Sequence, residues 1–227
     1  VGVSAGSHRL SRHLCPSVFI CGSSLPLRFF DWTWTIGAMN SVASLLGVAC
    51  DEVTAMLPAV PGLAPSLGAL GEAMFQTWNA HGKVLFAGNG GSCADAMHFA
   101  EELMVRFQKN RRALAAMALA DPTVVTCCGN DFGYDRIFSR QVGALGNPAD
   151  LLVVLTTSGN SPNCVLAVEA AKTIGMKTAA FLGKDGGKLR GACDIELLVP
   201  HPVTARVQEA HKLLFHTLCG WIDERVD

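Results

Sequence analysis

The sequence predicts a doubly wound α/β fold, in which five parallel strands carry helices on both faces. From residue 83 onward, apolar runs alternate with helical patterns, and each run is bounded by Gly, Pro, Asn or Asp. The runs are almost continuously apolar, which is typical of parallel strands that are buried on both faces. The strands are expected at residues 83–87, 113–119, 151–155, 177–182 and 195–199.

Helices are predicted between and after these strands. The best-marked one begins with Ser161 as its cap and Pro162 in its first turn, and it ends just before Gly175. The helices are expected at residues 93–107, 135–145, 162–174 and 204–224.

A pair of amphipathic helices is predicted ahead of the sheet, at residues 41–57 and 65–79. Apolar residues recur in both at helical spacing, and Pro58, Pro61 and Pro65 are expected to break the helical pattern between them. Such a pair can cover the sheet or pack against a partner subunit.

Residues 1–38 differ from the rest of the chain. They contain several arginines but a single acid, Asp31, and no helical or strand period persists. The first methionine is Met39, so we expect the natural protein to start there, with residues 1–38 an extraneous or disordered extension and residues 39–227 the functional domain. A basic, acid-poor targeting peptide is the alternative.

The composition excludes several classes of protein. A formal net charge of −1 gives no electrostatic reason to expect a nucleic acid or a membrane surface as partner. No apolar run approaches the roughly 18 residues of a membrane span. The nine cysteines form no CxxC pair, so we expect reduced thiols in a cytoplasmic protein.

A glycine turn follows the first strand, in the stretch from Asn89 to Ser92. Glycines let the backbone approach a ligand closely, and the start of the following helix, with Ser92 as its expected cap, favours an anion. His98 and Glu102 come next at i and i+4, so they share one face of that helix. On the residues alone, the turn is a weak phosphate signal, and the two side chains could equally form a solvated pair.

Two further strand ends carry polar residues. Hydroxyl groups and a glycine, from Thr156 to Ser161, follow the third strand, where a parallel sheet binds ligands. They suit a phosphate dianion, although capping alone explains them about as well. Asn130 and Asp131 are expected in a turn, where they could bind sugar hydroxyls or serve only as turn residues.

The final helix carries Gln208 and His216, eight residues apart. At roughly 100° per residue they lie about 80° apart around the axis, so both could face one site.

These segments together resemble the bacterial phosphoheptose isomerases, the sedoheptulose 7-phosphate isomerases of the sugar isomerase (SIS) superfamily. The sequences GNGGS, DAMHFAEEL, GNDFG, TSGNS, GKDGG and RVQEAH occur in the family's order and spacing, and the likeness spans residues 39–227. The chain departs from the family mildly, with Cys93 and Ala94 after GNGGS and Thr156 in place of the commoner serine. The resemblance implies a flavodoxin-like SIS fold and a homotetramer whose active sites draw on more than one subunit.

The resemblance also implies roles for individual residues. Glu102 would be the general base and His216 the general acid of an aldose–ketose isomerisation through an enediol(ate). A zinc ion would be held by His98, Glu102, Gln208 and His216. Substrate would be bound by Asn89, Gly90, Gly91, Ser92, Glu102, Asn130, Asp131, Thr156, Thr157, Ser158, Ser161 and Gln208.

Two other functions compete with this interpretation. One is a non-catalytic SIS protein that binds a replication initiator, but that relative lacks the residues equivalent to Glu102 and His216. The other is an isomerase of a different sugar phosphate, since loops and subunit packing set the length of the pocket. For the heptose enzyme, the product would enter heptose synthesis for lipopolysaccharide or glycoprotein.

Overall fold

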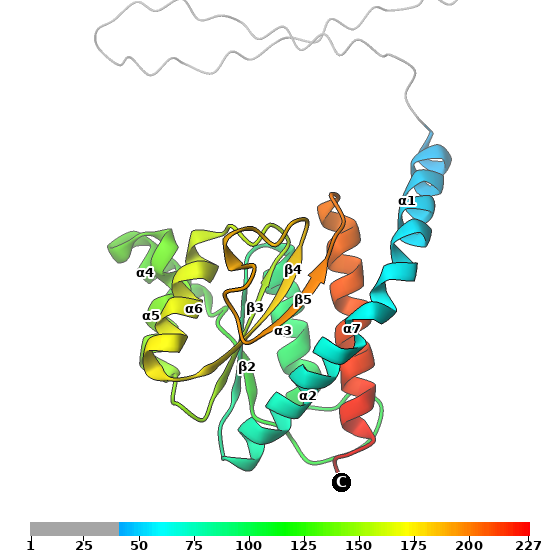
Figure 1. The fold of residues 1–227 in the computed structure, drawn as a ribbon. Coiled ribbons are helices and arrows are strands. Elements are labelled where there is room, and N and C mark those ends of the chain that lie inside the picture. The colour runs from blue at the N-terminus through cyan, green and yellow to red at the C-terminus, as the bar shows by residue number, and fades with distance from the viewer. Residues whose placement is uncertain (1–40) are drawn as a thin grey trace, which may run out of the picture. The chain divides into compact units, whose positions relative to one another are not determined.

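The computed structural model describes residues 41–227, in which five parallel strands form one sheet with the order β2-β1-β3-β4-β5 (Figure 1). This order confirms the predicted doubly wound sheet. The strands are β1 (Val84–Gly88), β2 (Ala116–Ala118), β3 (Leu151–Thr156), β4 (Lys177–Gly183) and β5 (Ile195–Val199).

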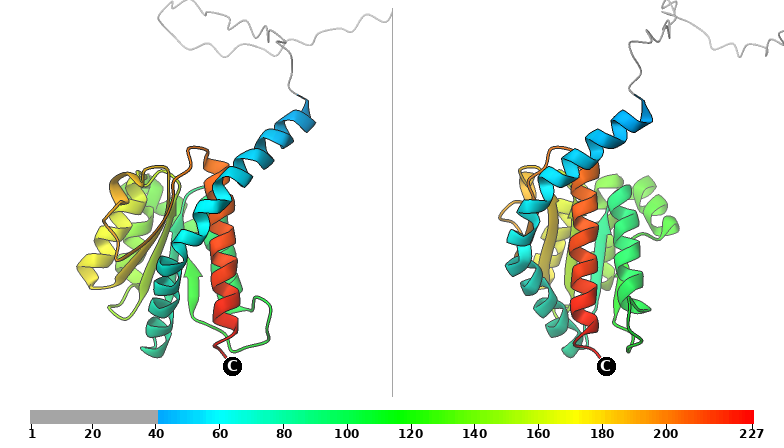
Figure 2. Two further views of the ribbon diagram at one scale, coloured as in Figure 1. Left: turned by 45° about the vertical axis from the view of Figure 1, so that its right-hand side comes forward. Right: turned by 90° about the vertical axis from the view of Figure 1, so that its right-hand side faces the viewer.

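Alternate residues of the strands enter two separate cores. Phe86 and Phe181 pack under α2 (Ala64–Asn79), α3 (Gly91–Met104) and α7 (Thr204–Asp223). Their neighbours along the strands, among them Leu85 and Ala180, pack on the opposite face. That face is covered by α4 (Pro122–Phe132), α5 (Ile137–Leu145) and α6 (Pro162–Ile174) (Figures 1 and 2). Burial on both faces explains why the strands are apolar at nearly every position.

The segment between β2 and α5 was predicted wrongly. It was expected to hold a turn, but most of it is helix α4, followed by the short 3-10 helix η2 (Tyr134–Arg136). Asp121 caps α4 by accepting hydrogen bonds from the backbone N–H groups of Thr123 and Val124, and Pro122 occupies the first turn, as is common at helix starts. Strand β2 is also shorter than expected, with three residues.

The predicted N-terminal helical pair is confirmed as α1 (Val42–Met56) and α2, but the prolines do not separate the helices. Pro58 and Pro61 lie in a 3-10 helix, η1 (Leu57–Leu63), that joins them without a gap. The joined stretch Val42–Asn79 is long and apolar enough to cross a membrane by length and composition, which the sequence analysis did not anticipate. The apolar window in this stretch is 11% buried, whereas α2, its C-terminal part, lies on the sheet with Leu70 and Met74 fully buried.

The topology places a crevice between β1 and β3. From β1 in the middle of the sheet, the chain first turns to β2 on one side and then crosses to β3 on the other. In doubly wound sheets ligands bind at this reversal, outside the carboxyl ends of the strands. The prediction made for residues 1–38 lies outside the described residues.

Candidate active site

A polar cavity of about 240 Å³ opens at the carboxyl ends of β1 and β3. Its walls come from the two strand-to-helix turns and from the first turns of α7. It is lined by Asn89, Gly91, Ser92, Leu155, Thr156, Thr157, Ser158, Ser161, Thr204 and Gln208. Eight of the predicted substrate-binding residues therefore meet in one place.

The turn after β3 is shaped by its own hydroxyl groups. Thr156 Oγ1 accepts a hydrogen bond from the N–H of Gly159 at 3.2 Å and lies 3.4 Å from Ser161 Oγ. Gly159 has φ +63°, and a Cβ on it would lie 1.8 Å from the carbonyl oxygen of Gly186, so only glycine fits there. Ser161 sits at the cap position of α6, but its side chain makes no capping bond.

The turn after β1 differs from the expectation at Ser92. The cap position of α3 is taken by Gly90, with φ +54°, and Ser92 lies buried within the first turn. Its hydroxyl accepts a hydrogen bond from Gln208 Nε2 at 3.4 Å. A Cβ on Gly91 would lie 2.6 Å from the same Gln208 nitrogen. Gly91 therefore makes room for Gln208, which reaches the cavity from α7.

Three of the four predicted metal ligands form a cluster between α3 and α7. The ligand atoms of His98, Glu102 and His216 all lie within 4.8 Å of one another. His98 Nε2 is 3.0 Å from Glu102 Oε1, and the ring centroids of the two histidines are 5.1 Å apart. The amide of Gln208 lies instead at the cavity beside Ser92.

The cluster fits a zinc ion in its chemistry. Imidazole nitrogens and a carboxylate oxygen are common zinc ligands, and three protein ligands leave a position open for a substrate. His216 Nε2 is buried and has no hydrogen-bond partner within residues 41–227. A buried nitrogen without a partner costs free energy unless something binds it.

The two helices that carry this cluster are fastened together at their C-terminal ends. Buried Arg111 donates to the carbonyl oxygens of Glu102 and Leu103 at the end of α3, and to Asp223 Oδ1 in α7 at 2.7 Å. Burial alone would raise the pKa of Asp223, but hydrogen bonds from the Lys109 and Gln108 backbone and from Arg111 lower the pKa below its ordinary value. Residues 105–110 are thereby held against α7.

Phe107, in this fastened segment, stacks on the ring of His216. The two ring planes are 19° apart, with the centroids separated by 5.5 Å. The ring of His216 thus contacts both Phe107 and His98, and these two contacts restrict its orientation.

Asn130 and Asp131 lie apart from the cavity lining. Both are exposed in the last turns of α4, where Asn130 donates to Asp131 at 2.8 Å. Their expected contacts with the sugar stay a prediction.

Sequence reasoning missed two residues beside the cavity, Asn163 and Tyr134. Asn163 exchanges two hydrogen bonds with Asn89, and the hydroxyl of Tyr134 donates to Asn89. Because the partners are distant in the chain, periodicity and spacing give no sign of them. The only available signal was a polar residue in the first turn of the helix after TSGNS.

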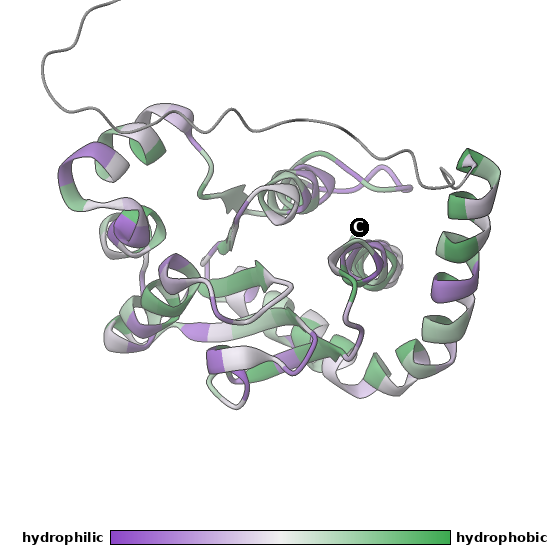
Figure 3. Cartoon of the chain, turned by 90° about the horizontal axis from the view of Figure 1, so that it is seen from above, coloured by the Kyte–Doolittle hydropathy of each residue, from purple (hydrophilic) through white to green (hydrophobic). Residues whose placement is uncertain are grey.

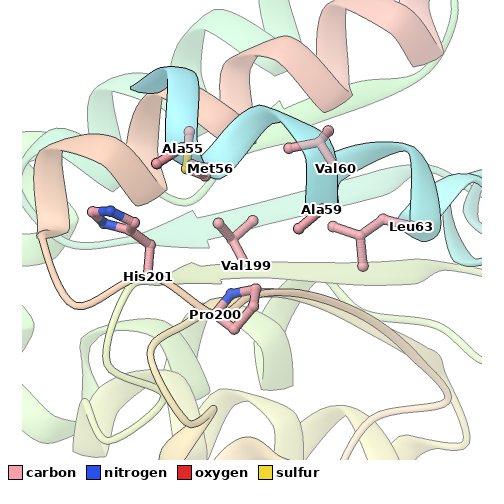
Figure 4. A pocket seen from close by; sticks show the side chains of 8 residues that line it. All are labelled: Ala55, Met56, Ala59, Val60, Leu63, Val199, Pro200 and His201. Carbon is pink, nitrogen blue, oxygen red and sulfur yellow. The ribbon is translucent and has the colours of Figure 1, made fainter. Parts of the chain in front are cut away.

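A second cavity lies near α1 and β5 but lacks the groups that a phosphate needs (Figure 4). Its volume is about 150 Å³, and only one of its side chains, that of His201, carries polar atoms. It is lined by Ala55, Met56, Ala59, Val60, Leu63, Val199, Pro200 and His201.

Comparison with known proteins places the chain in a family. The SIS domain family matches residues 50–183. The chain is 45% identical over 179 residues to the phosphoheptose isomerase of Leptospira biflexa, covering 78% of this chain and 92% of that protein. It is 52% identical over 145 residues to that of Paramagnetospirillum magneticum, covering 63% and 76% respectively. The chain belongs to the phosphoheptose isomerase family of SIS-domain proteins.

Solved structures of this family share the fold. The phosphoheptose isomerase of Neisseria gonorrhoeae is 41% identical with a TM-score of 0.77, covering 81% of this chain and 100% of that one. The enzyme from Francisella tularensis is 39% identical with the same TM-score, covering 82% and 100%. As a member of the phosphoheptose isomerase family, the chain is an aldose–ketose isomerase.

Proposed function

We propose that this enzyme converts D-sedoheptulose 7-phosphate to D-glycero-D-manno-heptose 7-phosphate, with Glu102 as base and His216 as acid. The observation that carries the proposal is the meeting of these two side chains, from α3 and α7, the same two helices whose first turns line the hydroxyl-rich cavity. The named activity of its relatives supports the same substrate.

The spacing of the two ends suits a long sugar. Gln208 lies at the cavity and His216 in the cluster. The rise of α7 separates their Cα atoms by about 12 Å along the helix axis, at roughly 1.5 Å per residue. An extended heptulose 7-phosphate spans about 10 Å from C1 to phosphorus, at about 1.2 Å per bond of an extended chain.

The phosphate would be held by hydroxyl groups and backbone N–H groups without an arginine. Ser92, Thr156, Thr157, Ser158 and Ser161 supply the hydroxyls, and Gly90 and Gly91 bring the backbone of the start of α3 close to the anion. Both α3 and α6 begin at this cavity, so two helix N-termini favour the dianion.

The proton steps follow from the groups in the cluster. Glu102 removes the proton from C1 of the ketose, while His216 gives a proton to the carbonyl oxygen on C2, which forms the enediol. His216 then takes the proton from O1 while Glu102 returns its proton to C2, which gives the aldose and restores both groups. Neither step changes the overall number of protons or electrons.

A zinc ion would be held by His98, Glu102 and His216, with Gln208 as the fourth ligand if its amide turns from Ser92. When bound, it would supply charge stabilisation to the oxygens at C1 and C2. Zinc content is measurable in the purified protein, and substitution of His98 by Ala is expected to remove it. Metal content that is unchanged in this variant would contradict the site.

The substrate is tested by incubating the purified protein with sedoheptulose 7-phosphate and following the aldose product. We expect turnover with the seven-carbon sugar and much slower turnover with pentulose and hexulose phosphates. Faster turnover of a shorter sugar would instead support the alternative isomerase. No turnover of any of them would favour the non-catalytic alternative.

We also propose that the enzyme assembles as a homotetramer through α1. Helix α1 extends away from the sheet (Figure 3). Its N-terminal half exposes apolar side chains, including Val42, Leu45, Leu46 and Val48. An exposed apolar face of this kind marks an interface. Sedimentation of the wild type and of Leu46→Glu tests this, since the variant should dissociate. A wild type that sediments as a monomer would refute the assembly.

The reaction is proposed to take place in the cytoplasm. All seven cysteines within residues 41–227 are free thiols, as is usual in a reducing compartment. Cell fractionation tests this placement.

A further inference from the structure

We propose that Asn163 is a positioning residue that fixes the two phosphate-binding turns relative to each other through the side chain of Asn89. The inference rests on the proposed function, because it assigns the cavity to a phosphate. Asn163 lies in the first turn of α6, outside the cavity lining, and is 1% exposed.

The two asparagines form a reciprocal pair. Asn89 Nδ2 donates to Asn163 Oδ1 at 2.8 Å, and Asn163 Nδ2 donates to Asn89 Oδ1, also at 2.8 Å. The hydroxyl of Tyr134 donates to the same Asn89 oxygen at 2.9 Å. Both lone-pair positions of this oxygen are therefore used inside the protein.

This network decides what Asn89 can offer to a ligand. Its side-chain oxygen already accepts hydrogen bonds from Asn163 and Tyr134, and one of its two side-chain N–H bonds donates to Asn163. The side chain therefore serves mainly to brace the turn, while the backbone N–H groups of Gly90 and Gly91 remain for the phosphate, since those of Ser92 and Cys93 donate to the carbonyl oxygens of Asn89 and Gly90.

The brace connects parts of the chain that must act together. Asn89 belongs to the turn between β1 and α3, and Asn163 follows directly after the turn between β3 and α6. A phosphate in the cavity takes donors from both turns at once, so its affinity depends on their separation. Small displacements weaken hydrogen bonds steeply through distance and angle.

The test measures the dissociation constant of inorganic phosphate by calorimetry, beside the kinetics with sedoheptulose 7-phosphate. Asn163→Ala and Asn89→Ala should each weaken phosphate binding about tenfold, and the double variant should lose no more than the weaker-binding single variant. Such non-additivity is the sign of residues that act as one unit. KM should rise by a similar factor, with a smaller change in kcat.

Further variants keep the test decisive. Tyr134→Phe, at an exposed position, should weaken phosphate binding two- to threefold and keep the fold intact. Asn163→Ser serves where alanine prevents folding. The matched control is Asn79→Ala, at the exposed end of α2 away from the cavity, which should leave phosphate affinity unchanged.

Two outcomes would overturn the inference. One is that the losses from Asn89→Ala and Asn163→Ala multiply in the double variant. The other is that the variants melt at lower temperature but bind phosphate like the wild type, which would make the pair merely structural. Because phosphate binding is measured without turnover, a wild type that binds phosphate but does not isomerise the heptulose refutes only the proposed function.

Discussion

The cavity proposed to hold the phosphate (the phosphate end) and the cluster of His98, Glu102 and His216 (the chemical end) are built in different ways. The phosphate end consists of two short turns, each of which follows a strand and begins a helix, so that its hydroxyls and N–H groups come from neighbouring residues. The chemical end consists of three side chains from two helices, α3 and α7, and Glu102 and His216 are more than a hundred residues apart in the chain.

This difference determines what holds each end in place. Each phosphate turn is shaped by local hydrogen bonds, such as that between Gly159 and Thr156, and the Asn89–Asn163 pair joins the two turns. The cluster depends on the packing of α3 against α7, and Arg111 and Asp223 hold these two helices together at their C-terminal ends. We therefore expect the phosphate end to tolerate single changes better than the chemical end does.

The largest effect is expected from the acid–base pair. Glu102→Gln and His216→Gln should each lower kcat by about 10³- to 10⁴-fold, because each removes a group that moves a proton in the reaction. Phosphate affinity, measured by calorimetry, should stay within about twofold. Equal losses of phosphate binding would show that the two ends are not separate, and unchanged turnover would remove the catalytic assignment.

The next effect is on stability. Arg111→Met should lower the free energy of unfolding by about 3–5 kcal/mol, since it leaves the Asp223 carboxylate buried without its partner. Urea denaturation measures this. The matched control is Lys109→Met, which breaks the exposed pair with Glu224 and should cost less than about 1 kcal/mol. An equal loss of unfolding free energy in both variants would mean that the buried Arg111–Asp223 pair stabilises the fold no more than the exposed pair does.

A pH dependence is expected from His211, which anchors α7 to β4 by a hydrogen bond to the Leu182 carbonyl at 3.0 Å. Burial lowers its pKa to about 4. The unfolded chain, with an ordinary histidine pKa near 6.5, binds the proton first as the pH falls. Its contribution to stability is therefore complete above about pH 6.5 and is lost progressively toward pH 4.

This loss should reach about 2 kcal/mol between pH 7.5 and pH 5, at about 1.4 kcal/mol per pH unit. Urea denaturation at the two pH values measures it in the wild type and in His211→Gln. The glutamine keeps a donor for the Leu182 carbonyl but does not titrate. The loss of stability between pH 7.5 and pH 5 should therefore be about 2 kcal/mol smaller in the variant than in the wild type. An identical pH dependence in both proteins would exclude His211 as the source.

The smallest effect is expected at the phosphate end. Ser161→Ala should raise KM for the heptulose phosphate about tenfold or somewhat more, the usual cost of one hydrogen bond to a charged group, with kcat nearly unchanged. Ser139→Ala, at a half-buried position of α5 outside the cavity lining, is the control and should change neither parameter. A fall in kcat with unchanged KM would place Ser161 at the chemical end instead.

Much of the fold was accessible from the sequence because its signals are local. Continuous apolar runs identified all five strands, and the Ser161, Pro162 and Gly175 signals located α6 to the residue. The missed helix α4 is mostly exposed, and its GNDFG ending was interpreted as a turn. The residues that mark the start of α4 are Asp121, which caps it, and Pro122 in its first turn.

The sequence by itself determined the order of the strands and helices, the hydroxyl-rich turns and the residues able to perform acid–base chemistry. Only the tertiary structure decided which of these residues meet. It brought His98, Glu102 and His216 together, left Gln208 beside Ser92, and put Asn163 behind Asn89. The physical reason is that turns and helix starts depend on neighbouring residues, whereas contacts between helices depend on how two cores pack against one sheet.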